Sequence, residues 1–183
     1  MIGKLKNYGF MGNNMPKGLK ATSSMIQISG SVVETTANAP TSERIDLQLN
    51  ALDQEVFVVQ AVDLGIAIPE NRANATTNVT MTLSSTPRAA VGSISMPSTI
   101  AYLRNSLSNV EDTCAVLQES RGGETPPACL EYVYIIATND FYANIQGSGN
   151  STPKGGSFRV YGYRARADAA TYAALVQSEL LSE

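Results

Sequence analysis

Residues 77–83 read Thr-Asn-Val-Thr-Met-Thr-Leu, and this stretch decides the fold class. Its apolar residues, Val79, Met81 and Leu83, occupy alternate positions. They therefore share one face of an extended strand, while the polar residues share the other. A strand with one apolar and one polar face is typical of an antiparallel sheet that covers a core on one side. The stretch predicts a half-buried antiparallel strand.

The same period of two recurs on either side of this strand. Ile45, Leu47 and Leu49 alternate with polar residues, and longer apolar runs at 56–62 and 132–137 predict central strands covered on both faces. Turn residues separate these runs at the spacing of a sandwich or barrel. We expect an all-β fold, an antiparallel β-sandwich with a jelly roll of about eight strands as its topology, although other sandwiches fit the same pattern. Strands are expected at 25–36, 44–50, 54–64, 77–84, 89–96, 130–138, 141–147 and 157–165.

Two segments have helical signals. Ser98 is a candidate N-cap for a short helix that carries Ile100 and Leu103. Asp168 is a candidate N-cap for a C-terminal helix at about 168–181, which has an apolar stripe and four alanines in its first half. We expect this second helix to pack on the sandwich or on a neighbouring subunit.

Positive charge is concentrated near the N-terminus. Residues 1–33 contain four lysines and no Asp, Glu or Arg, a net charge of +4. The other nine basic and sixteen acidic residues give −7, so the whole chain carries −3. Residues 1–24 are also rich in Gly and Asn and cannot form a core, so we expect a flexible basic arm there. Residues 25–183 then form a single β-sandwich domain, because a chain of this length has one core.

The arm has three readings. It can contact the phosphates of nucleic acid or of anionic lipid headgroups through its lysines and aromatic residues. It can dock on another subunit, because an extended segment of 20 residues reaches about 65 Å and this one contains Met11 and Met15. It can also be a solvated tail. The candidate contact residues are Lys4, Lys6, Tyr8, Phe10, Lys17 and Lys20.

Catalytic chemistry has little support in the sequence. The chain contains no histidine, which removes the commonest general base near neutral pH and the commonest metal ligand. No carboxylate pair is fixed by local spacing, Gly-x-Ser-x-Gly is absent, and the glycine-rich loop around Lys154 lacks the P-loop pattern. We expect no enzyme activity, no cofactor and no metal site. We also expect no signal peptide, and no apolar run approaches the ~18 residues of a membrane-spanning helix.

The interpretation of two pairs of residues depends on the cellular compartment of the protein. Cys114 and Cys129 bracket a segment whose Gly and Pro residues are typical of an exposed loop, and they either form a disulfide or remain free thiols. Asn74 and Asn78 lie in Asn-x-Thr sequons, which are glycosylation sites only if the chain meets the glycosylation machinery. In a chain rich in Thr, Ser and Asn, such sequons also arise by chance.

The late strand at 157–165 presents a strip of interface-type side chains. Arg159, Tyr161 and Tyr163 fall on one of its faces, and Arg and Tyr are enriched at protein interfaces. The alternatives are an ordinary solvent-facing surface and RNA binding, although the strip lacks the signature of an RNA-recognition sheet. Only 16% of the residues are charged, fewer than the roughly 25% typical of soluble domains. Such a surface favours contact with neighbouring subunits.

The basic arm, the alternating strands and the long Ser/Thr/Gly/Pro loops resemble the layout of single jelly-roll capsid proteins of small or tailless icosahedral viruses. The stretch from Asp140 to Gly147, followed by residues 158–163, is also similar to the paired late strands of virion proteins. The resemblance implies a virion structural protein that self-assembles into a capsid shell. It also implies an arm that locks subunits together and faces the genome or an internal membrane. Partners would be copies of the chain and other virion proteins.

Two other classes remain open. One is an accessory virion protein of a tail or decoration. The other is an extracellular, cell-surface lattice or filament subunit that uses the arm as a donor strand. The arm also lacks the arginine cluster of many RNA-packaging arms, so subunit locking or membrane contact competes with genome contact.

Overall fold

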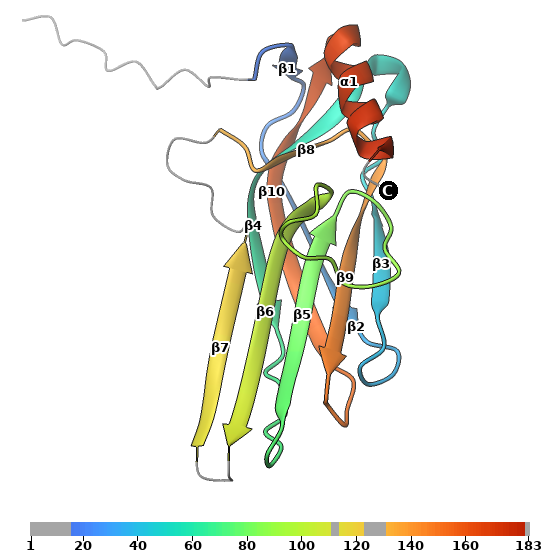
Figure 1. Cartoon of the computed structure of the whole chain (residues 1–183). Helices are drawn as coiled ribbons and strands as arrows, with labels where there is room; N and C mark the ends of the chain where they lie inside the picture. Colours follow the sequence, from blue (N-terminus) through green and yellow to red (C-terminus); the bar gives the residue numbers. More distant parts are fainter. Residues whose placement is uncertain (1–15, 111–113, 123–130, 182–183) are drawn as a thin grey trace, which may run out of the picture.

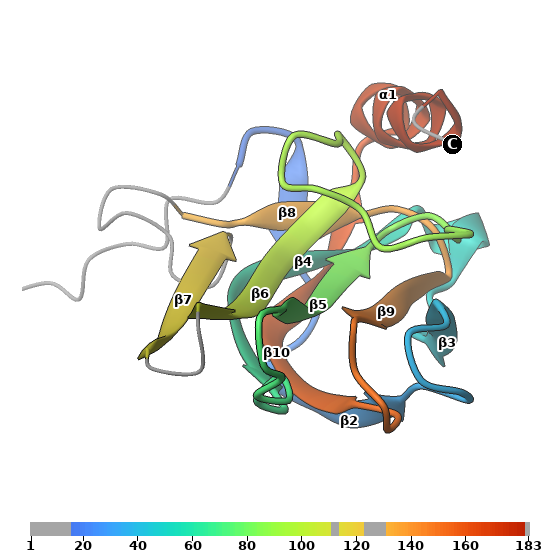
Figure 2. The same ribbon diagram turned by 60° about the horizontal axis from the view of Figure 1, so that its bottom comes forward.

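Two antiparallel sheets form the body of the molecule, and the helix α1 (Ala169–Leu180) follows them (Figure 1, Figure 2). The computed structural model describes residues 16–110, 114–122 and 131–181. The predicted all-β sandwich is confirmed, because most of these residues lie in strands and the two sheets enclose a common core.

The first sheet is built around its long last strand. β4 pairs with one side of β10, and β2 and β1 pair with successive parts of the other side. β8 pairs with the far side of β4 and completes the order β1-β10-β4-β8. The strands are β1 (Leu19–Ala21), β2 (Ile26–Val33), β4 (Glu55–Ile66), β8 (Tyr134–Ile136) and β10 (Gly155–Ala167).

The second sheet has the order β3-β9-β5-β6-β7. Every neighbouring pair in it is antiparallel, and β7 forms its outer edge beyond β6 (Figure 1). The strands are β3 (Thr41–Asp46), β5 (Thr76–Ser84), β6 (Thr99–Val110), β7 (Cys114–Gly122) and β9 (Asp140–Ser148). A short 3-10 turn, η1 (Ala51–Asp53), connects β3 to β4.

The strand pairs are nested along the chain. β5 pairs with β6, β4 with β8, β3 with β9 and β2 with β10, so each pair encloses the one before it. Successive pairs lie in alternate sheets. Pairing of β10 with β4 and of β9 with β5 joins them into the two sheets. β7 stands outside this scheme as an additional edge strand.

The main core lies between the sheets. Val79, Met81 and Leu83 are fully buried in it, as their alternation predicts. Phe141 of β9 meets Phe158 of β10 edge to face, with ring centroids 5.8 Å apart, so an aromatic pair joins the two sheets. Burial of these apolar side chains is the main stabilising contribution to the fold.

A second apolar cluster lies on the outer face of the first sheet, under α1. Val56 and Val58 alternate with the core residues Phe57 and Val59, so they point away from the main core. They are nevertheless fully buried, because α1 packs over them. This cover explains why the predicted central strand is apolar on both faces. The helix contributes Tyr172, Leu175 and Val176 to the cluster.

α1 begins at the predicted N-cap. The carboxylate of Asp168 accepts a hydrogen bond from the backbone N–H of Thr171 at 2.8 Å, and hydrogen bonds from Thr171 lower the pKa of Asp168. The backbone N–H of Asp168 donates to the carbonyl of Gly18 at 2.9 Å. Among the described residues, no helix is both long and apolar enough to cross a bilayer.

Two predictions for the segment between β5 and β7 are wrong. Residues 89–96 form a turn-containing connection instead of a strand, and the N–H of Met96 closes one of its turns on the carbonyl of Ser93 at 3.1 Å. The predicted helix after Ser98 is the strand β6. Its apolar residues have helical spacing, but β6 pairs with β5 on one side and β7 on the other, and this tertiary pairing outweighs a weak helical propensity.

β7 lies where the sequence predicts a loop. Its apolar residues Val116 and Leu117 are adjacent instead of alternating, so they give no signal with a period of two. β8 is also shorter than the predicted strand at 130–138.

Candidate functional site

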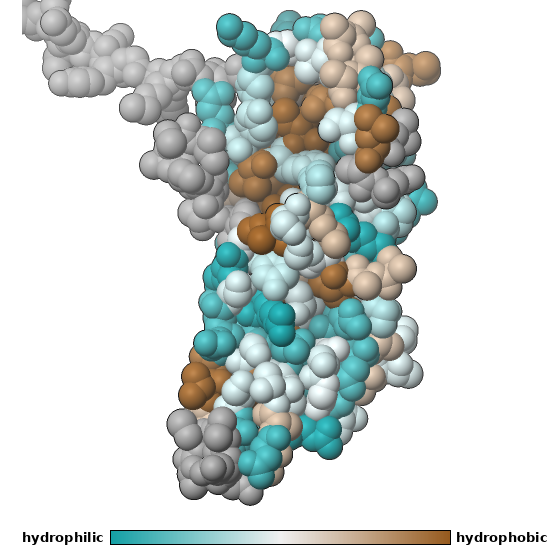
Figure 3. All heavy atoms as spheres, in the orientation of Figure 1, coloured by the Kyte–Doolittle hydropathy of each residue, from teal (hydrophilic) through white to brown (hydrophobic). Residues whose placement is uncertain are grey.

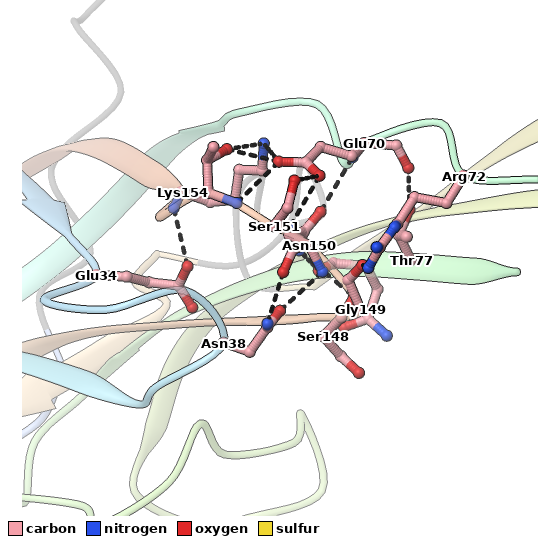
Figure 4. A network of polar contacts seen from close by, with 12 residues as sticks. Glu34, Asn38, Glu70, Arg72, Thr77, Ser148, Gly149, Asn150, Ser151 and Lys154 are labelled. Atoms are coloured by element: carbon pink, nitrogen blue, oxygen red, sulfur yellow. Dashed lines mark hydrogen bonds and ion pairs between the residues drawn. The ribbon is translucent and has the colours of Figure 1, made fainter.

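A network of polar side chains ties three loops together at the end of the sandwich opposite α1 (Figure 1, Figure 4). The loops connect β2 to β3, β4 to β5 and β9 to β10. Glu70 of the second loop accepts hydrogen bonds from Ser151, Thr152 and Lys154 of the third. The Nζ of Lys154 lies 2.9 Å from Oε1 of Glu70, and Lys154 is largely buried. These contacts, those from Ser151 foremost, hold the pKa of Glu70 far below its usual range.

Two further residues of these loops, Glu34 and Asn150, bond to backbone groups of the loops and of neighbouring strands. Glu34 is buried and accepts hydrogen bonds from the N–H groups of Gly147 at 2.6 Å and Lys154 at 2.8 Å. Asn150 is buried and exchanges two hydrogen bonds with Asn38. Its side chain also donates to the carbonyl of Asn78 at 2.9 Å and accepts from the N–H of Glu70 at 3.0 Å.

The network is therefore a structural clamp. The charged and amide groups of its centre already bond to one another, and the ammonium of Lys154 is held by Glu70. The glycine-rich loop around Lys154 forms the corner between β9 and β10, and it is followed by a strand, whereas a P-loop is followed by a helix. Asn150 also belongs to a sequon, and its buried amide is committed to this clamp.

A small cavity of about 260 Å³ lies between α1 and β8. Glu179 lines it and is buried, and the backbone N–H of Ala137 donates to its Oε1 at 3.3 Å. Burial raises the pKa of Glu179 above its usual range. Tyr134 lines the same cavity, and burial raises the pKa of its hydroxyl, which is 3.0 Å from the hydroxyl of Ser85. This carboxyl group ties the helix to the sheet.

The predicted interface strip is divided between two environments. Arg159 and Tyr161 lie on the part of the outer face that α1 leaves open, and Arg159 donates to the Tyr161 hydroxyl at 3.3 Å. Tyr163 packs against the cluster under α1, and burial raises its pKa. Beside Arg159 is a shallow hollow of about 560 Å³ that also includes Gly30 and Gly65.

The candidate arm residues fall into two groups. Lys4, Lys6, Tyr8 and Phe10 lie outside the described residues. Lys17 and Lys20 are described and exposed. Lys20 belongs to β1, where it pairs with Arg166 of β10.

The predicted boundary of the arm at residue 24 differs from the structure. Leu19–Ala21 pairs with β10, and Gly18 holds the N–H of Asp168 at the start of α1. Gly18 has a φ of +85°, and its backbone passes so close to Asp168 that a side chain there would collide with the carboxylate. The last part of the predicted arm is therefore anchored to the body.

The remaining candidate residues have separate locations. Asn74 is exposed, with a φ of +51°, and Asn78 is half-buried beside Thr80 in a hollow on the second sheet. Cys114 begins β7, whereas Cys129 lies outside the described residues, so the choice between a disulfide and free thiols stays a prediction. In the described ranges, no three acidic or cysteine side chains gather as metal ligands would.

No protein-family model matches the chain, and no curated protein matches it.

Proposed function

We propose that this chain is a virion structural protein, a jelly-roll subunit that assembles with copies of itself into a capsid shell. The nested strand pairing carries the proposal. A jelly roll is an antiparallel hairpin of strands wrapped around a core, so its pairs enclose one another and alternate between two sheets. The pairs from β2·β10 inward to β5·β6 follow this rule.

The surface of the molecule supports a role in assembly. Few of its residues are charged, and large apolar side chains are exposed on several elements, among them Leu52 of η1, Val33 of β2 and Ile68 after β4. Figure 3 shows brown apolar residues between polar ones on one face of the molecule. Interfaces between subunits bury apolar and aromatic groups within a polar rim, and the open face around Arg159 and Tyr161 offers such groups.

The polar clamp fits the same role. A shell wall needs subunits whose corners keep one shape, because each corner must meet the same neighbour throughout the assembly. Glu70 and Asn150 hold three corner loops in place from within the subunit. In this proposal the basic arm lies inside the shell, where it locks subunits together and faces a genome or an internal membrane.

Electron microscopy of the purified full-length chain tests the proposal, together with light scattering across a range of protein and salt concentrations. We expect closed particles of many chains. A monomer that persists under every condition would overturn the proposal. Tubes or flat sheets would indicate a cell-surface lattice or filament subunit instead. A small closed ring would indicate an accessory virion protein.

A further inference from the structure

β7 is an open strand edge that the nested pairing does not require. It pairs with β6 along its whole length, from Cys114 opposite Val110 to Gly122 opposite Tyr102, and no other strand of the described residues pairs with it. Figure 1 shows β7 at the outer side of the sandwich. The backbone N–H and C=O groups on its other side can therefore pair with a further strand.

Both faces of β7 are exposed as well. Every residue from Ala115 to Arg121 is exposed, and the adjacent side chains of Val116 and Leu117, which point to opposite faces, are 51% and 50% exposed. The two charged residues of the strand, Glu119 and Arg121, form an ion pair with each other. A long edge with exposed apolar side chains is prone to uncontrolled association unless another segment covers it.

Charge complementarity favours one segment of the chain as the partner of this edge. In sequence, residues 111–131 hold five acidic residues and one basic residue, a net charge of −4. Residues 1–15 contain Lys4 and Lys6 and no acidic residue, a net charge of +2. The sequence on both sides of β7 is therefore acidic on balance, and the segment that precedes the described body is basic. The acidic residues are Glu111, Asp112, Glu119, Glu124 and Glu131, against Arg121.

The length and origin of the basic segment favour a contact between copies. Fifteen residues precede the first described residue, Pro16, and they reach about 50 Å when extended. The body begins with β1 at one edge of the first sheet, whereas β8 forms the opposite edge. β4, next to β8, packs against β6, so β7 lies on the β8 side of the molecule. Donor and acceptor thus lie on different sides, which is the geometry of a head-to-tail contact.

We propose that residues 1–15 of one copy add as a strand to the open edge of β7 in the next copy. Backbone hydrogen bonds supply the pairing, and opposite charges select the partner. Lys4, Lys6, Tyr8 and Phe10 occupy alternate positions, so they share one face of such a strand. This inference rests on the proposed self-assembly and names the surface that receives the arm.

Photo-crosslinking of the full-length protein tests the contact. Tyr8 is replaced by the photoreactive Tyr8→p-benzoylphenylalanine, and a control protein carries the same probe at the exposed Tyr132. Copies labelled with nitrogen-15 are mixed with unlabelled copies before assembly. We expect the probe at position 8 to crosslink to the tryptic peptide 105–121, which contains most of β7, with about half of the crosslinks joining labelled to unlabelled chains. The yield falls as salt is raised, because screening weakens the charge attraction.

Two outcomes contradict the contact between copies. Crosslinks that join only residues of the same chain show that the arm folds back on its own body. Crosslinks from position 8 to other strands, or to copurifying nucleic acid, assign the arm another partner. The control probe at Tyr132 should give no crosslink to the peptide 105–121 from another chain.

A pair of substitutions separates this inference from the proposed shell. Leu117→Lys places a charge on the open edge at a half-exposed position, which should abolish the crosslink while the unfolding temperature stays the same. Val33→Lys is the matched control, because Val33 is similarly exposed at 59% on β2, which is also an edge strand. Loss of the crosslink in Val33→Lys but not in Leu117→Lys overturns β7 as the acceptor. Closed particles that give no crosslink from position 8 refute the contact between residues 1–15 and β7 but not the proposed shell. Open filaments that give this crosslink refute the shell but not the contact.

Discussion

Glu70 and Ser151 are joined by two hydrogen bonds across 81 positions of sequence. Ser151 donates to Oε2 of Glu70 from its backbone nitrogen at 2.8 Å and from its hydroxyl at 2.5 Å. Thr152 repeats the arrangement on the other carboxylate oxygen, Oε1. One ionised side chain therefore fixes the corner between β9 and β10 against the corner between β4 and β5.

We expect Glu70→Gln to lower the unfolding temperature at neutral pH. A neutral amide cannot accept all of these hydrogen bonds, and it removes the partner of the Lys154 ammonium. The pKa of Glu70 is lower in the folded protein than in the unfolded chain, so its contribution is present at neutral pH and is lost as the pH falls below about 4.3. The difference between wild type and variant should shrink in acid when both are followed by thermal unfolding.

Glu43→Gln is the matched control for this change. Glu43 is exposed on β3, and its substitution should leave the unfolding temperature within error at each pH. An equal loss in both variants, or a Glu70→Gln effect that is independent of pH, would show that the clamp does not depend on the charge of Glu70.

We expect Glu179→Gln to stabilise the protein at neutral pH. Burial raises the pKa of Glu179, with a further contribution from the charge of Asp140, so the folded state disfavours the ionised form. Stability is then greatest below about pH 4.3 and falls as the pH rises through the raised pKa. A glutamine keeps an oxygen for the N–H of Ala137 and carries no charge.

Thermal unfolding at about pH 4 and pH 7 tests the prediction for Glu179→Gln. The variant should match the wild type in acid and exceed it at neutral pH, the opposite pH dependence to that of Glu70→Gln. A variant that is less stable at neutral pH would indicate that the ionised form of Glu179 holds α1 in place.

We expect Gly162→Ala to cost about 1–3 kcal/mol of unfolding free energy. Gly162 lies at a register shift between β10 and β4, where a β-carbon would come within 2.4 Å of the carbonyl oxygen of Val58 and 2.7 Å of the Phe57 ring. The backbone of Val58 has no freedom to move, because it sits between the main core and the cluster under α1. Urea unfolding of dilute, dissociated protein measures the loss.

Gly65→Ala provides the comparison for the glycine substitution. Gly65 lies on β4 near the other end of the sheet, and its nearest neighbour to a new β-carbon is the hydroxyl of Ser157 at 3.3 Å. We expect a change of about 0.5 kcal/mol or less. Similar losses at both positions would mean that the destabilisation arises from glycine flexibility and not from the close approach at the register shift.

Local patterns in the sequence predicted most of the strands and the helix. The alternation around Met81 follows from the side-chain period of a strand, which any extended segment with one buried face must show. Asp168 predicted the start of α1 because an N-cap is a local interaction. β7 could not be predicted, because a strand that is exposed on both faces shows no alternation of apolar and polar residues. It forms a strand because it pairs with β6.

The clamp around Glu70 could not be found from the sequence, because the partners of Glu70 in the corner between β9 and β10 are 80 or more positions away and no local pattern joins them. The loop at 146–156 gave the one available signal, an excess of Gly, Ser and Asn that indicates a corner. The predicted boundary of the arm, residue 24, lies beyond β1 for a related reason. Residues 19–21 have no strong strand pattern and form β1 only because β10 extends beyond β2.

Truncation of the N-terminus should separate the arm from the body. We expect deletion of residues 1–15 to leave the unfolding temperature unchanged and to impair particle formation, because these residues precede every described contact. Deletion of residues 1–21 should also lower the unfolding temperature, because it removes β1 from β10 and the Gly18 carbonyl from the N–H of Asp168. Thermal unfolding and electron microscopy of both truncations distinguish these effects. Normal particles from the shorter deletion would exclude the arm from assembly, and an unchanged unfolding temperature in the longer one would show that β1 adds nothing to the fold.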